Sequence, residues 1–151
     1  MGQAALLALN NRNAVELSWL EPARLAQLLG WASYARGVGD AQAMLIAFGA
    51  GDAYDGLNFA WFKARFERFI YVDRVAVAAA ARGQGLARLL YADLFGFARD
   101  AGQKLVACEV NRLPPNPASD RFHERLGFRV VGEASLDAGQ KSVRYMICPV
   151  S

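Results

Sequence analysis

Two glycines stand immediately before the strongest amphipathic pattern of the chain, in the stretch VAVAAAARGQGLARLL, and this arrangement suits the binding of an anion. The pattern predicts a helix that starts just after Gly85. The first turn of a helix carries unpaired backbone N–H groups and about half a positive charge, so it can hold a phosphate or pyrophosphate. Gly83 and Gly85 would let the backbone approach the phosphate oxygens with no side chain between them. The simpler interpretation is that both glycines only form a tight turn from strand to helix.

The spacing of these glycines disfavours the common nucleotide sites. GQGLAR has no third glycine where a dinucleotide fingerprint requires one, and it contains no Gly-Lys-Ser or Gly-Lys-Thr. Nicotinamide nucleotides and nucleoside triphosphates are therefore poor candidates for the ligand. No metal site is expected either, because neither Cys108 nor Cys148 has a second Cys or a His at metal-ligand spacing.

Two motifs of the chain resemble those of the Gcn5-related N-acetyltransferase (GNAT) superfamily. Arg82, Gly85 and Ala87 match its coenzyme A loop, which reads Arg or Gln, two residues, Gly, one residue, then Gly or Ala. The second block, NPASDRFHERLGF, follows at the usual distance, and the likeness covers roughly residues 71–131. The resemblance implies an α/β fold with a central mixed β-sheet flanked by helices, in a single domain over residues 1–151. It also implies N-acetyltransferase activity with acetyl-coenzyme A as co-substrate.

The resemblance further implies which residues bind acetyl-coenzyme A. The loop 82–87 would hold the pyrophosphate with its backbone, and the strand end at 75–77 would pair with the pantetheine arm. Asn116 would contact the same arm, or it would cap the helix that Pro117 opens, and both roles stay open. The implied binding residues are Val75, Val77, Arg82, Gly83, Gln84, Gly85, Leu86, Ala87 and Asn116.

Acetylation of an amine needs a base, because the amine is mostly protonated at neutral pH. Glu109 lies near the end of the apolar run LVACEV, where an unpaired buried carboxylate is costly, so we expect it to have a role. Some ribosomal-protein N-terminal acetyltransferases resemble this segment, with a Glu-Val pair used as the base. The alternative for Glu109 is an ion pair with one of the nearby arginines, for example Arg112. Asp73 is the competing base, and its alternative is a structural ion pair with Arg74.

His123 stands where much of the family has a tyrosine that gives a proton to the leaving thiolate. An imidazole can donate a proton near neutral pH, so His123 is the expected acid. Its alternative role is to cap or pack a helix, and Tyr71 and Tyr145 are further candidate acids. The two cysteines are interpreted as buried thiols, and no base accompanies either of them, so we expect direct transfer without an acetyl-enzyme.

The remaining expectations concern partners and location. The acceptor would be a small-molecule or peptide amine that the sequence does not identify, and homodimer formation stays open. A net charge of +3 with a pI near 9.1 permits nucleic-acid binding, but the Lys and Arg residues are scattered, so we expect none. No membrane span is expected, and a cytoplasmic location is the prediction. The alternative function is a coenzyme A-binding module that senses or interacts but does not catalyse.

The elements that must position these residues follow from the apolar periodicity and from Gly and Pro punctuation. Helices are expected from 21 to near 37, shortly before 69, from 86 to 102 and from 117 to 127. Strands are expected at 4–9, 43–48, 69–77, 105–110, 128–131 and 143–147, with a surface loop at 49–56. This interleaving predicts a mixed sheet with helices on its faces. The aromatic side chains of Phe59, Trp61, Phe62 and Phe66 would line the acceptor pocket or pack in the core.

Overall fold

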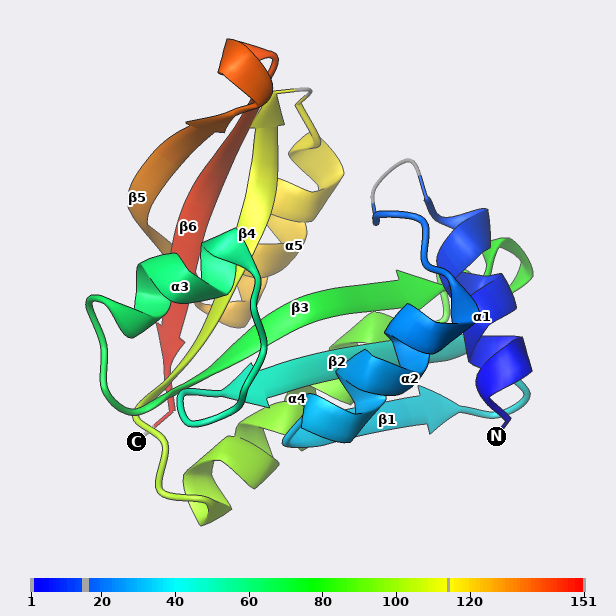
Figure 1. The fold of residues 1–151 in the computed structure, drawn as a ribbon. Coiled ribbons are helices and arrows are strands. Elements are labelled where there is room, and N and C mark those ends of the chain that lie inside the picture. Colours follow the sequence, from blue (N-terminus) through cyan, green and yellow to red (C-terminus); the bar gives the residue numbers. More distant parts are fainter. Residues whose placement is uncertain (1, 15–16, 114, 151) are drawn as a thin grey trace.

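Six strands form one mixed sheet in the order β1-β2-β3-β4-β6-β5 (Figure 1). The computed structural model describes residues 2–14, 17–113 and 115–150. All neighbouring strands are antiparallel except β3 and β4, which are parallel. The strands are β1 (Tyr34–Val38), β2 (Ala43–Gly49), β3 (Phe69–Val77), β4 (Leu105–Leu113), β5 (Arg129–Leu136) and β6 (Lys141–Pro149). The α/β class and the mixed sheet that the sequence predicts are confirmed.

Helices cover both faces of this sheet, because its strands bury side chains on both sides. Figure 1 shows α1, α2 and α3 in front of the sheet and α4 and α5 behind it. In β3, Ile70 and Val72 face the cluster that includes Leu90 of α4, whereas Tyr71 faces the cluster that includes α2 and α3. The helices are α1 (Gln3–Arg12), α2 (Pro22–Trp31), α3 (Leu57–Lys63), α4 (Leu86–Asp100) and α5 (Pro117–Leu126).

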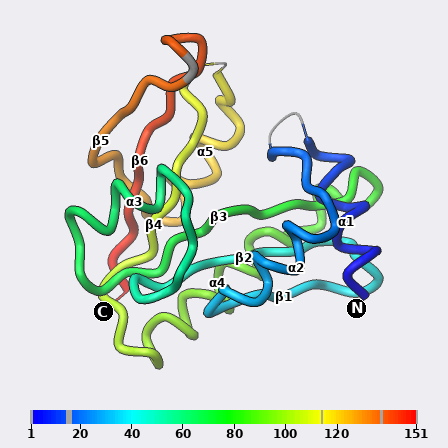
Figure 2. Tube along the Cα trace, in the orientation of Figure 1, coloured from blue at the N-terminus to red at the C-terminus, as the bar shows by residue number. Residues whose placement is uncertain are grey.

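The two parallel strands pair over a short length and then separate. The pairing of β3 with β4 runs only from Phe69 opposite Leu105 to Tyr71 opposite Ala107. Beyond these residues the two strands diverge, which is clearest in the tube of Figure 2. The second halves of β3 and β4 therefore form the two sides of an opening in the middle of the sheet.

The N-terminal third of the chain differs from the sequence prediction. Residues 4–9 were expected to form a strand, but they belong to helix α1, and this prediction is wrong. The segment AALLAL contains only strong helix formers and no β-branched residue, so propensity favours the helix. Helix α2 ends at Trp31 instead of near Gly37, because residues 34–38 form the edge strand β1. Only Tyr34 of this strand is fully buried, and the sequence YARGV shows no alternation of apolar and polar residues that would indicate a strand.

The elements around the two motifs match the prediction. Strand β3 spans 69–77, and the short aromatic helix before it is α3. Helix α4 begins after Gly85, and α5 begins after Asn116 and ends at Gly127, whose left-handed backbone (φ +101°) terminates it. The predicted strands at 105–110, 128–131 and 143–147 are present and are longer than expected.

Candidate active site

Three connected hollows lie at the opening between β3 and β4. We call the first the splay cavity, of about 150 Å³, which is lined by 72–75 of β3, 108–111 of β4, Tyr91, Asn116, Ser119 and His123, together with Leu17, Asn58, Lys141 and Val143. The second is the α3 cavity, of about 260 Å³, lined by Ala14, Leu17, Ser18, Tyr54, 56–58, Tyr71, Asp73, Arg74, Glu109 and Lys141. The third is the loop groove, of about 540 Å³, lined by Asn13, Leu17, 75–77, Arg82, Gly83, Ala87, Asn116, 118–119 and 122–123. Leu17 borders all three.

The loop before α4 has the geometry of an anion site. Gly83 and Gly85 have φ values of +82° and +76°, a left-handed conformation that residues with a Cβ rarely adopt. Gly85 is the N-cap of α4, and no side chain caps this end of the helix. A Cβ at either glycine would meet nothing within 4 Å, so the backbone is open to an approaching ligand. The free N–H groups of the first turn are therefore available to an anion.

Most of the predicted coenzyme residues line the loop groove. Its wall includes Val75, Val77, Arg82, Gly83, Ala87 and Asn116. Gln84, Gly85 and Leu86 belong to the same turn and helix start but are not among the lining residues. The groove thus runs from the uncapped start of α4 to the splay cavity, with which it shares Asn116 and His123.

Asn116 caps helix α5 and also borders the loop groove. Its Oδ1 accepts a hydrogen bond from the backbone N–H of Ser119 at 3.3 Å, so the predicted cap is present. This bond uses only the oxygen of the amide group. The Nδ2 group is a donor that the cap does not need, so one side chain can serve the helix and still face the groove.

Glu109, like Asp73, lines both the splay cavity and the α3 cavity. The hydroxyl of Tyr71 donates a hydrogen bond of 2.5 Å to its Oε2. Burial raises the pKa of Glu109 to about 7, and the charge of Asp73 acts in the same direction, while hydrogen bonds from Tyr71 and Asn58 oppose the rise. The expected alternative, an ion pair with Arg112, is wrong, since Arg112 lies 3.9 Å from Glu133 instead. A carboxylate with a pKa near 7 is suited to accept a proton at neutral pH.

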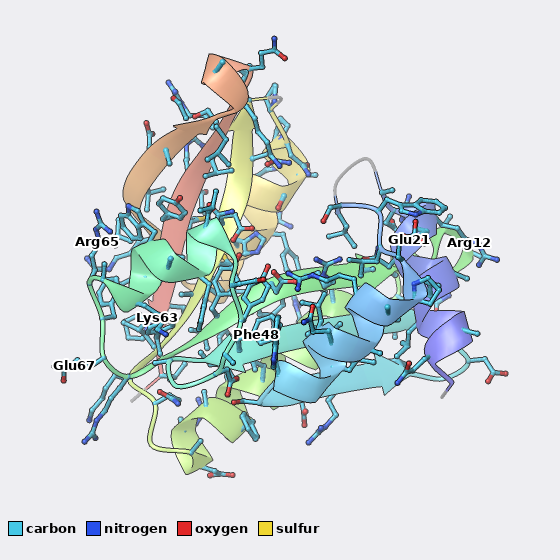
Figure 3. The ribbon with its side chains drawn as sticks, in the orientation of Figure 1. Arg12, Glu21, Phe48, Lys63, Arg65 and Glu67 are labelled. Carbon is cyan, nitrogen blue, oxygen red and sulfur yellow. The ribbon has the colours of Figure 1, made fainter. Side chains whose placement is uncertain are left out.

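Asp73 is engaged by two neighbours. Arg74 lies 2.7 Å from its Oδ2, and the hydroxyl of Tyr54 donates to its Oδ1 at 2.6 Å. The side chains of Arg74 and Asp73 are only 7% and 5% exposed, so this is a buried ion pair. The structural alternative proposed for Asp73 is thus confirmed. Tyr54 is itself held by Phe48, whose ring stacks on it with centroids 4.1 Å apart. Figure 3 labels Phe48.

His123 is buried between α5 and α4, with 6% of its surface exposed. Its Nδ1 lies 2.7 Å from the carbonyl of Ser119, which can only accept, so Nδ1 carries the hydrogen. Nε2 then accepts from the hydroxyl of Tyr91 at 3.1 Å. Burial lowers the pKa of His123, which favours this neutral form. The imidazole therefore holds Tyr91 in place, a partner that the sequence prediction missed.

The end of α1 supplies further residues that the sequence prediction did not identify. Arg74 donates to Oδ1 of the fully buried Asn10 at 2.8 Å, and Asn10 donates to the carbonyl of Ser18 at 3.0 Å. Asn11 makes two hydrogen bonds with the backbone of Leu20. The bond from Asn10 holds Ser18, which lines the α3 cavity. The run NNRN was visible in the sequence, but nothing local indicated which distant groups its amides would meet.

The aromatic residues before β3 mostly form core. Phe59 and Phe62 are 1% and 0% exposed, so core packing is confirmed for both. Trp61 stacks on Tyr145 with centroids 4.2 Å apart, and Tyr145 donates to Asn58 at 2.8 Å. Asn58, which accepts this hydrogen bond, also lines the α3 cavity.

Cys108 and Cys148 are buried and not joined to each other, so the prediction of buried thiols is confirmed. Among the residues that the structure describes, no group of three or more His, Cys, Asp or Glu side chains is arranged to hold a metal ion. Within the same ranges, no helix combines the length and the apolar character needed to cross a membrane.

Known proteins share both the sequence pattern and the fold. The model of the family described as "Acetyltransferase (GNAT) family" matches residues 11–128. Phosphinothricin N-acetyltransferase of Streptomyces coelicolor is 42% identical to this chain over 71 residues, which make up 47% of this chain and 40% of that protein. The match therefore spans less than half of this curated relative.

Solved structures resemble the chain over nearly all of its length. The ribosomal-protein-S18-alanine N-acetyltransferase from Escherichia coli has a TM-score of 0.71 at 18% identity, covering 99% of this chain and 88% of that one. The yncA protein of Salmonella typhimurium, solved with its cofactor acetyl-CoA, has a TM-score of 0.65 at 21% identity, covering 100% of this chain and 91% of that one. At these identities the likeness concerns the fold.

Proposed function

Because this chain belongs to the acetyltransferase (GNAT) family, we propose that it moves an acetyl group from acetyl-coenzyme A to the primary amine of a small molecule or peptide. The activities for which its relatives are named, on phosphinothricin and on an alanine of a ribosomal protein, span both acceptor types. The observation that carries the proposal is the position of Glu109. This carboxylate, with its pKa near 7, lies in the splay cavity, which shares walls with the loop groove on one side and the α3 cavity on the other.

The loop groove fits the coenzyme. The uncapped start of α4 offers N–H donors and a positive dipole end to the pyrophosphate, and the open glycines admit it. Val75 and Val77 would border the pantetheine arm, and Nδ2 of Asn116 would donate to it. The groove ends at His123, so the thioester would reach the splay cavity.

The α3 cavity would hold the acceptor amine. Glu109 takes a proton from the ammonium, directly or through one water, and the free amine nitrogen attacks the thioester carbonyl. The new C–N bond forms and the C–S bond breaks. The nitrogen releases its second proton as the amide forms, and the leaving thiolate takes up one proton to become the free thiol. Since both substrates lie on the two sides of one opening, proximity supplies much of the rate. Asp73 is assigned to the support of Arg74 and Tyr54, because its carboxylate is already engaged.

We assign the protonation of the leaving thiolate to Tyr91, with His123 as the residue that positions it. A neutral, buried imidazole is a poor acid, but it orients the Tyr91 hydroxyl beside the splay cavity. Burial raises the pKa of Tyr91 well above its usual value, so this hydroxyl keeps its proton at neutral pH. To donate to the leaving sulfur, this hydroxyl must turn its single hydrogen from Nε2 of His123 toward the sulfur. The engaged state of His123 is also the feature that favours the alternative function, a module that binds coenzyme A without catalysis.

The test combines binding with turnover. Calorimetry should detect acetyl-coenzyme A binding, and free-thiol release should appear with amines from a broad panel. Glu109→Gln should lower kcat by about a hundredfold or more with little change in coenzyme affinity. The control is Glu124→Gln, an exposed carboxylate on α5, which should behave as the wild type. Coenzyme binding without thiol release would establish the silent module, and no binding at millimolar coenzyme would refute both functions.

A further inference from the structure

The α3 cavity contains one cation that no described carboxylate neutralises. Its charged lining residues are Asp73, Arg74, Glu109 and Lys141. Arg74 pairs with Asp73 at 2.7 Å, and its Nη1 donates a hydrogen bond to Oδ1 of Asn10 at 2.8 Å. Glu109 is bonded to Tyr71. Among the side chains that the structure describes, which exclude those of 1, 15–16, 114, 137 and 151, no ion pair includes Lys141.

Strand register places Lys141 on the same side of the sheet as Glu109. Glu109 of β4 lies opposite Tyr145 of β6, and alternate residues of a strand face the same way. Lys141 therefore shares its face with Val143 and Tyr145, and it lines both the splay cavity and the α3 cavity. Lys141 and Tyr145 are four positions apart on β6, which is about 13 Å of strand. Because Glu109 lies opposite Tyr145 and the lysine side chain is long, one small molecule can contact both the ammonium group of Lys141 and the carboxylate of Glu109.

We propose that the acceptor is a small amine that also carries an anionic group, as amino acids do, and that Lys141 binds this group while Glu109 receives the proton of the amine. This inference rests on the proposed function and names the substrate class of the same site. The volume of about 260 Å³ suits such a molecule, because cavities for drug-sized ligands measure about 300–1,000 Å³.

Charge argues against the other classes of amine. A polyamine would bring a second cation toward Lys141, and Asp73, the only other carboxylate among the described lining residues, is already paired. A peptide N-terminus has no anionic group close to its amine, so Lys141 would remain without a partner. An amino acid satisfies both ends of the cavity at once.

The experiment compares amino acids with their amides and with the corresponding decarboxylated amines. These compounds differ in basicity, so the quantity measured is the change in their kcat/KM ratio on substitution. Lys141→Ala should reduce the acid-to-amide ratio about tenfold, mainly through KM for the acid, and should leave the amide unaffected. Lys141→Glu should favour the amide and the amine over the acid. The control Lys104→Ala removes an exposed lysine between α4 and β4 and should keep the wild-type ratio.

A binding arm separates this inference from the proposed function. Calorimetry of amino acids against protein saturated with coenzyme A, which cannot react, should give about tenfold weaker binding in Lys141→Ala than in the wild type. Loss of that difference, or an unchanged acid-to-amide ratio, overturns the assignment of Lys141. A polyamine or a peptide as the best acceptor overturns it as well. Amino-acid binding that depends on Lys141 without any thiol release would support the subsite and refute the proposed catalysis.

Discussion

The hydroxyl of Tyr71 donates to Oε2 of Glu109 at 2.5 Å, next to the point where β3 and β4 stop pairing. A second pair of the same kind lies beside it, because Tyr54 donates to Asp73 at 2.6 Å. The two neighbours of Glu109 have opposite effects on its proton. The bond from Tyr71 stabilises the ionised carboxylate, whereas the charge of Asp73 destabilises it.

Substitution of these two neighbours should move the pH profile in opposite directions. The wild type should show a rising limb of kcat/KM near pH 7, where Glu109 loses its proton. Tyr71→Phe removes a donor to the carboxylate, so the pKa of Glu109 rises and the limb moves to higher pH. Asp73→Asn removes a negative charge, so the pKa falls and the limb moves to lower pH. Rates at low acceptor concentration over roughly pH 5 to 9 measure both shifts.

The acceptor titrates identically with every variant, so it contributes no difference between the profiles. Glu124→Gln serves again as the control and should superimpose on the wild type. Shifts of the same sign in Tyr71→Phe and Asp73→Asn would contradict this account of the base.

The raised pKa of Glu109 also predicts how stability depends on pH. The pKa is about 7 in the folded protein and 4.5 for the free side chain, so between these values the folded state binds more protons than the unfolded state. The free energy of unfolding therefore falls as the pH rises through this window, and the full loss is present above pH 7. Glu109→Gln removes this titration. Its Tm relative to the wild type should be higher at about pH 8 than at about pH 4.5.

Thermal unfolding followed by circular dichroism at both pH values provides the measurement. The exposed Glu124→Gln should show no such dependence on pH. An equal Tm difference for Glu109→Gln at the two pH values would mean that Glu109 titrates normally in the folded protein.

The parts of the site that sequence predicts are those defined by local patterns. These are the glycines at 83 and 85, the apolar stripe of α4 and the Asn-Pro start of α5. The conformation of each depends only on residues that are close to it in the sequence. The same holds for β3, whose bounds of 69–77 follow from one apolar run. The edge strand β1 lacks such a run. The apolar run of Ala and Leu residues in α1 is too short for periodicity to distinguish strand from helix, so only helix propensity indicates the helix.

The parts that sequence does not predict are contacts between distant residues. Tyr54 meets Asp73 across 19 positions, and Asn10 meets Arg74 across 64. No periodicity relates such residues, because the divergence of β3 and β4 and the packing of α1 bring them together. The role of Asp73 depends on Tyr54 and Arg74, and the role of His123 depends on Tyr91, which is 32 positions away. A sequence can therefore propose a carboxylate or an imidazole as catalytic, while its neighbours decide whether it is free to act.

The pair formed by Tyr91 and His123 should act as one unit in catalysis. Tyr91→Phe removes the hydroxyl that faces the splay cavity, and His123→Phe removes the acceptor that orients it. Each should lower kcat about tenfold with little change in acetyl-coenzyme A affinity, and the double variant should lose no more than either single one. Ser119→Ala is the control, because the backbone carbonyl at 2.7 Å still holds Nδ1 when the hydroxyl is gone. Multiplied losses in the double variant would show that the two side chains act independently, and unchanged kcat in both single variants would remove them from the leaving-group step.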